Sequence, residues 1–187
     1  MKNSRLVLAI VLVVLLVDQL TKIWIKTHLL YGEMIPIFGS DRAFIHFVEN
    51  EGMAFGRRLN IPHGKLLLSL FRIAAAGVLI LLIRSVLEDR RVQKGVLICF
   101  ALILAGAIGN IIDSAFYGMI FSASYSHGLP AEIFPAEGGY SSFLHGKVVD
   151  MFYFPLYETQ LPTWLPGIGG RSFTFFSSCI QHSRRSH

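Results

Sequence analysis

Charged residues are scarce in this chain, since Asp, Glu, Lys and Arg make up 16% of its 187 residues. Hydrophobic residues make up 53%, and the mean hydropathy of +0.55 is well above that of an ordinary soluble domain. The two cysteines, Cys99 and Cys179, are too few for a disulfide framework and do not have metal-ligand spacing. Composition therefore excludes a disulfide-stapled scaffold and a cysteine metal centre, and it makes the lipid bilayer the expected solvent.

An excess of basic residues gives a net charge of +5, which in a soluble protein would suggest nucleic-acid binding. Here the Lys and Arg residues flank apolar runs, where they act as topology signals, so no nucleic-acid partner is expected. The length suits one domain with a few membrane helices and connecting loops. We therefore treat residues 1–187 as a single membrane-embedded domain.

Three apolar segments are long enough to span a bilayer, which takes roughly 20 residues. The first covers residues 6–25 and lacks a small-residue cleavage site, so we expect a retained helix and not a signal peptide. The others cover residues 66–83 and 96–117. The N-terminus and the loop 84–94 are rich in basic residues, which places both in the cytoplasm by the positive-inside rule.

The connecting segments on the other, outer side predict short strands and loops. Residues 34–38 and 43–48 are rich in Ile and Phe with partial alternation, which is typical of short strands. Residues 121–146 and 155–170 contain Gly, Ser and Pro without an apolar period, so both are predicted to be loops. The expected fold is an all-α polytopic membrane protein with a small outer-face β element.

Ionisable side chains at membrane depth cost about 2.5 to 3.5 kcal/mol each on insertion, so each one needs a partner or a function. Asp18 and Lys22 are four residues apart and share a helix face. This spacing fits an ion pair within the helix, and it fits a role facing substrate equally well. Arg72 interrupts the second apolar run, and we expect its charge to snorkel or to pair within the protein.

Asn110 and Asp113 are three residues apart and follow the small-residue run 106–109, which lets a neighbouring helix approach closely. Hydrogen bonding between helices explains this polar pair as readily as a role in a site. Asp150 is enclosed by apolar and aromatic residues. Desolvation there would raise the pKa of its carboxyl, which suits a group that must hold a proton. Asp150 is therefore the candidate functional acid on physical grounds.

Four local patterns now resemble one family, the lipoprotein signal peptidases, also called signal peptidase II. Together they are specific because they occur in this order and at matching membrane depth. In this sequence they are Asp18-Gln-Leu-Thr-Lys22, Asn50-Glu-Gly-Met-Ala-Phe55, Gly106-Ala-Ile-Gly-Asn-Ile-Ile-Asp113 and Val148-Val-Asp150.

The resemblance implies a membrane aspartyl peptidase with four helices that needs no metal or cofactor. Such an enzyme cleaves diacylglyceryl-modified prolipoproteins before the lipidated cysteine, near the outer face of the bacterial inner membrane. Two aspartates share the acid and base roles, and Asp150 matches the first of them. The remaining matches are positions that bind substrate or support the site, and Asp113 is not the family's second catalytic acid. These positions are Asn50, Gly52, Asn110, Asp113, Asp18 and Lys22.

The family's second aspartate lies in a Phe-Asn-x-Ala-Asp pattern on the fourth helix, but no Asp follows Asp150 in this chain. The peptidase domain is therefore expected to be incomplete at its C-terminus, without that helix. Residues 180–187 can be written ATT CAA CAT AGC CGA CGC AGC CAC. Read one base later, these letters encode Phe-Asn-Ile-Ala-Asp-Ala-Ala. We therefore hypothesise a frameshift near Cys179 and impaired activity of this chain.

Two other functions remain open at this point. A catalytically inactive membrane protein that binds lipoproteins would keep Asn50 and Asn110 without the aspartate pair. A small ion-coupled transporter could use the charged residues of the spans, although no inverted repeat supports it. For the peptidase we expect a monomer in contact with membrane lipid and diacylglyceryl-modified prolipoproteins, with its N-terminus in the cytoplasm and its site near the outer face.

Overall fold

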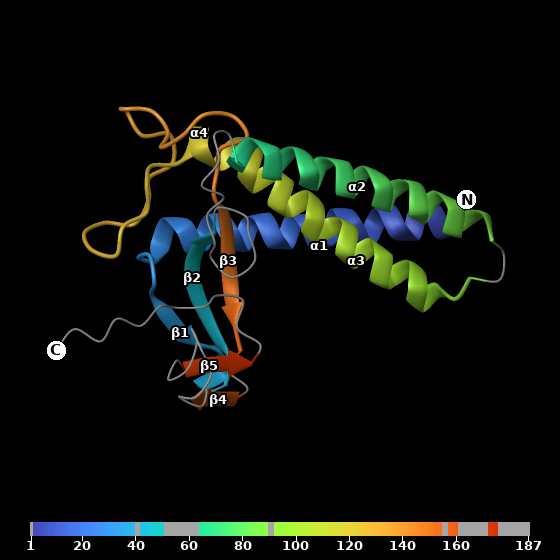
Figure 1. Cartoon of the computed structure of the whole chain (residues 1–187), viewed down its shortest axis with the longest axis horizontal. Coiled ribbons are helices and arrows are strands. Elements are labelled where there is room, and N and C mark those ends of the chain that lie inside the picture. The colour runs from blue at the N-terminus through green and yellow to red at the C-terminus, as the bar shows by residue number, and fades with distance from the viewer. Residues whose placement is uncertain are drawn as a thin grey trace, which may run out of the picture.

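The structure, a computed structural model, describes most of the chain. The described ranges are residues 2–39, 42–50, 64–89, 92–154, 157–160 and 172–175. Three long helices lie side by side, and a small sheet lies at the end of this helix layer that is opposite the N-terminus (Figure 1). The expected combination of membrane-length helices with a small β element is confirmed.

The helices follow the three apolar runs of the sequence and extend each by a few residues. They are α1 (Lys2–His28), α2 (Gly64–Glu88) and α3 (Lys94–Ile112). The third continues through a π-helical stretch, Asp113–Tyr117, into the short helix α4 (Gly118–Ile120). In the described part of the chain, α1, α2 and the segment from α3 through α4 are long and apolar enough to cross a membrane.

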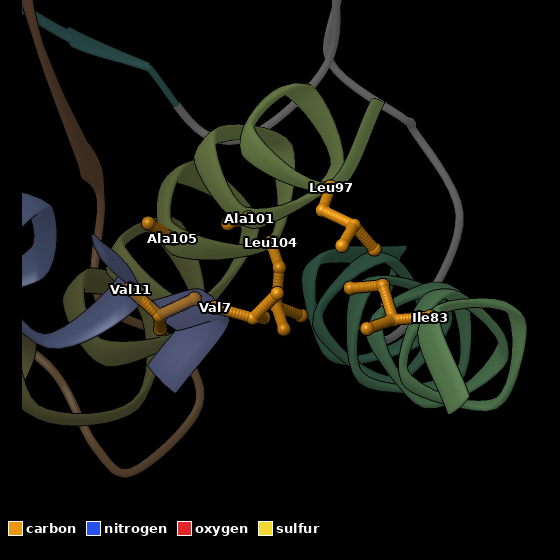
Figure 2. Packing of buried hydrophobic residues seen from close by; sticks show 7 residues of the cluster. All are labelled: Val7, Val11, Ile83, Leu97, Ala101, Leu104 and Ala105. Carbon is orange, nitrogen blue, oxygen red and sulfur yellow. The ribbon is translucent and has the colours of Figure 1, made fainter. Parts of the chain in front are cut away.

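The helices pack through small and branched side chains at the end of the layer that is remote from the sheet. Ala101 and Ala105 on α3 are fully buried, and such small residues let helix backbones approach closely in a bilayer. Leu8, Leu12 and Leu16 on α1 remain more than half exposed, so this stripe faces lipid. Figure 2 shows buried side chains of α1, α2 and α3 pointing toward one another: Val7, Val11, Ile83, Leu97, Ala101, Leu104 and Ala105.

The main sheet has three antiparallel strands in the order β1-β2-β3. They are β1 (Met34–Pro36), β2 (Phe44–Asn50) and β3 (Val148–Tyr153). Two of these strands were predicted from sequence, and β3 was not. In the pairing of β2 with β3, Val48 lies opposite Asp150, after a register shift between Ile45 and Val48.

The remaining sequence predictions had mixed outcomes. The second predicted loop is wrong in part, because β4 (Tyr157–Gln160) pairs antiparallel with β5 (Ser172–Phe175). The rest of that loop, and the segment 176–187 where a fourth helix was sought, lie outside the described residues. The expected loop 121–146 does lack strands and helices, apart from one isolated bridge between Phe121 and Ile133.

This loop is fastened to the ends of the helices by backbone hydrogen bonds. Ala131 N donates to the carbonyl oxygen of Lys26 on α1 at 3.3 Å, and Gly146 N donates to that of Ser114 at 2.8 Å. A side chain at Gly146 would collide with the backbone oxygen of Asp113, so glycine is required where the chain crosses the π-helical stretch. The loop thereby delivers β3 to the end of α3.

Candidate active site

Asp113, the first residue of the π-helical stretch, is fully buried at the junction of α1, α3 and β3. Its carboxylate accepts hydrogen bonds from Lys22 Nζ at 2.8 Å and from Gln19 Nε2 at 3.0 Å. A third comes from the backbone N–H of Val149 at 3.2 Å. π-Helical turns inside α-helices are frequent at functional sites. With three donors, this buried charge is compensated and fastens the strand to both helices.

Lys22 is buried as well, with 3% of its surface exposed, and it connects α1 to α3. Besides Asp113, its Nζ lies 3.1 Å from Asp18 Oδ2 and 3.2 Å from Asn110 Oδ1. The ion pair within the helix that the spacing of Asp18 and Lys22 suggested is therefore present. The same ammonium group also reaches the neighbouring helix, so both interpretations of this pair describe parts of one network.

Gln19 completes the network, and the sequence analysis missed it. Its Nε2 also donates to Asp18 Oδ2 at 3.1 Å, and its Oε1 accepts a hydrogen bond from the Tyr117 hydroxyl at 3.2 Å. An amide in the middle of an apolar helix, beside two charged residues of the same run, was the available signal.

The two glycines of the small-residue run have different surroundings. A Cβ at Gly109 would collide with the carboxylate of Asp18, so this glycine is what lets α1 and α3 approach. Among the described residues, a Cβ at Gly106 would meet nothing within 4 Å. The expectation that both glycines serve close helix packing is therefore wrong for Gly106, which instead lines a pocket.

That pocket, of about 230 Å³, lies between the helices and β3. Asp150 lines it, and the Asn50 side chain of β2 hydrogen-bonds to the Asp150 carboxyl. Burial raises the pKa of Asp150, while this hydrogen bond and the charges of Lys22 and Arg72 oppose the rise. A carboxyl with a raised pKa beside a pocket is a candidate for holding and transferring a proton. The lining residues are Asp18, Lys22, Gly106, Asn110, Val149, Asp150, Met151 and Phe152.

A second buried polar cluster joins α1 to β2 and to the loop before β3. Lys26 is fully buried, and its Nζ donates to Glu49 Oε1 and, at 2.7 Å, to Ser124 Oγ. Lys147 Nζ lies 3.5 Å from Glu49 Oε2. Because Glu49 immediately precedes Asn50, this cluster holds the end of β2 beside the pocket. The sequence analysis did not identify it.

The sequence comparisons give the family of this chain. The family described as Signal peptidase (SPase) II matches residues 10–174. The chain is 50% identical over 177 residues to the lipoprotein signal peptidase of Porphyromonas gingivalis, which covers 93% of this chain and 74% of that relative. It is 32% identical over 172 residues to the lipoprotein signal peptidase of Amoebophilus asiaticus, covering 91% of this chain and 66% of the relative. No solved structure matches. The chain belongs to the signal peptidase II family.

The signal peptidase II family is a family of peptidases. The structure brings most of the candidate residues of this chain to one pocket. Asp18, Lys22, Asn110 and Asp150 line the pocket, and Asn50 contacts Asp150. Asp113 lies behind them under Val149, while Gly52 falls outside the described residues. Within the described ranges, no group of His, Cys, Asp and Glu side chains could hold a metal ion.

Proposed function

We propose that this chain is a membrane aspartyl peptidase of the signal peptidase II type, with Asp150 as a catalytic carboxylate. The observation that carries the proposal is the position of Asp150, which lines the pocket where α1, α3 and β3 meet. Asn50 orients this carboxyl through its hydrogen bond, and Lys22 and Asn110 line the same pocket. Asp113 has a supporting role, because its oxygens are already occupied by three donors.

The chemistry assigned to Asp150 is proton transfer during hydrolysis of a peptide bond. Its carboxylate removes a proton from a water molecule as the water oxygen attacks the carbonyl carbon before the substrate cysteine. The carbonyl oxygen must gain a proton from a second acid, which the family supplies from a second aspartate. No Asp follows Asp150 in this sequence. We therefore propose that adding the family pattern after Cys179 would supply the second acid and raise the activity.

The proposed substrates are diacylglyceryl-modified prolipoproteins. One wall of the pocket is apolar, formed by Met151, Phe152 and Gly106, and Phe152 is half exposed. Such a wall suits a signal segment that arrives from the bilayer. We propose that the pocket lies near the outer face of the inner membrane. The basic N-terminus and the basic loop after α2 support this orientation, because basic residues favour the cytoplasmic side. We propose that the protein acts as a monomer.

The test measures cleavage of a purified diacylglyceryl-modified prolipoprotein in detergent micelles, by gel shift and by mass spectrometry of the released peptide. It compares this chain with a version that continues as Phe-Asn-Ile-Ala-Asp after Cys179 and through a fourth helix. We expect the restored version to cleave about 10² to 10⁴ times faster, which is what general acid–base catalysis contributes.

In the restored version, Asp150→Asn should remove the increase in cleavage rate. Asp89→Asn, at the exposed residue that follows α2, should retain full activity. Equal turnover by the original and restored chains would refute the proposed role of a second aspartate. Full turnover by Asp150→Asn would refute the assignment of the catalytic carboxylate.

A further inference from the structure

Arg72 is a charged residue in an otherwise apolar membrane helix. Between residues 66 and 83 it shares α2 with only one other polar side chain, that of Ser69. An arginine at membrane depth is costly unless it pairs or serves a function. It lies in the first half of α2, and this helix begins at the end of the helix layer where α4 and the sheet lie (Figure 1).

The guanidinium group of Arg72 contacts the π-helical stretch that continues α3. Its Nη1 donates to Ser114 Oγ at 2.9 Å, and Ser114, which is 2% exposed, donates in turn to the carbonyl oxygen of Asn110 at 2.9 Å. Ser69, one turn earlier on α2, donates to the carbonyl oxygen of Leu144 at 2.9 Å. These contacts hold the polar face of α2 against the site, with Arg72 in electrostatic contact with Asp150 and Asp113.

The charge balance around the pocket indicates what this guanidinium does. Three carboxylates lie there, those of Asp18 on α1, Asp113 in the π-helical stretch and Asp150 on β3. From α1 they face the ammonium group of Lys22, which already lies 3.1 Å from Asp18 and 2.8 Å from Asp113. The charge of Lys26, which also acts on Asp113, is balanced by its ion pair with Glu49. Without Arg72, an ionised Asp150 would face a group with a net negative charge, because one cation would serve two other acids.

We propose that Arg72 is a positioning residue of the site, which adds from α2 a second positive charge to that of Lys22 and so helps to keep Asp150 ionised and ready to accept a proton. This inference rests on the proposed function of Asp150. Ser114 anchors the guanidinium, so the second helix takes part in the chemistry without touching the substrate. Asn50 on β2, which is uncharged, completes the surroundings of the Asp150 carboxyl.

The test titrates Asp150 directly in the chain as it exists. The protein is labelled with ¹³C at its Asp carboxyl carbons, and chemical shifts are followed against pH in detergent micelles. The Asp150 signal is assigned by its loss in Asp150→Asn. We expect Arg72→Met to move the titration midpoint of Asp150 to higher pH by about one unit, because an opposite charge is removed. Arg72→Lys keeps the positive charge, so its titration midpoint should lie close to that of the unchanged chain.

The matched control is Arg84→Met, the same substitution on the same helix at an exposed position, which should leave the midpoint unchanged. Ser114→Ala should give a smaller shift than Arg72→Met, in the same direction, and it keeps the test available should Arg72→Met fail to fold. An unchanged midpoint in the folded Arg72 and Ser114 variants would overturn the inference. An equal shift in Arg84→Met would do the same. The titration needs no cleavage, so its result is independent of whether any form of the chain is an active peptidase.

Discussion

The buried ion pair between Lys22 and Asp113 offers the sharpest test of how the site is held together. The two side chains are 4% and 0% exposed, and the atoms Nζ and Oδ2 are 2.8 Å apart. Lys22→Met would leave Asp113 buried as an anion that keeps, within the described part of the chain, its Gln19 and Val149 donors alone. Removing one partner of a buried pair typically costs about 3 to 5 kcal/mol. We expect a loss of folding free energy in that range.

The assay is unfolding in mixed micelles with a rising fraction of SDS, followed by circular dichroism. Lys94→Met, at an exposed position at the start of α3, is the matched control and should cost less than about 0.5 kcal/mol. The double variant Lys22→Met with Asp113→Asn should be more stable than the sum of the two single losses implies, because no unpaired charge remains. A Lys22→Met variant as stable as the control, or losses that simply add, would refute the reasoning.

Two further predictions concern the helix contact and the sheet. Gly109→Ala should destabilise the fold by about 1 to 3 kcal/mol, because the added methyl group meets the Asp18 carboxylate. Gly106→Ala has room among the described residues and should be nearly neutral. Equal effects of the two substitutions in SDS unfolding would contradict this prediction. His46 is 4% exposed, and its Nε2 has no hydrogen-bond partner among the described residues. Burial lowers the pKa of its ring, so the folded state binds a proton less readily than the unfolded chain. The contribution of neutral His46 to stability is therefore present above about pH 6.5 and is lost as the pH falls below that value. Thermal unfolding should show a lower melting temperature at pH 5.5 than at pH 7.5, and His46→Leu should reduce this difference.

The helices could be predicted because their signal is local. Each apolar run has the length that a bilayer requires, and the structure adds only short extensions, such as from residues 66–83 to Gly64–Glu88. The strand β3 could not be predicted in this way. Its sequence, Val-Val-Asp-Met-Phe-Tyr, lacks alternation, and its partner β2 lies about a hundred residues earlier. Pairing over such a distance is decided by tertiary structure and not by local preference.

The candidate site was predicted as a set of residues but not as a geometry. The spacing of Asn110 and Asp113 indicates a shared helix face, and the structure does bring Asn110 and Asp150 to one pocket. It does not indicate that Asp113 receives a backbone N–H from β3, because that contact depends on the loop 121–146. The pairing of Lys26 with Glu49 also depends on tertiary structure, because it joins a helix to a strand, and it could not be predicted from local sequence.

The hydrogen bond between Asp113 and the backbone N–H of Val149 limits substitution differently at its two ends. The donor belongs to the main chain, so every amino acid except proline would provide it at position 149, limited only by the space available to a side chain that is 1% exposed. The acceptor is a side chain, and no other residue type supplies the same two oxygens at the same reach. Drift at position 149 should therefore be limited by size, and drift at position 113 by chemistry.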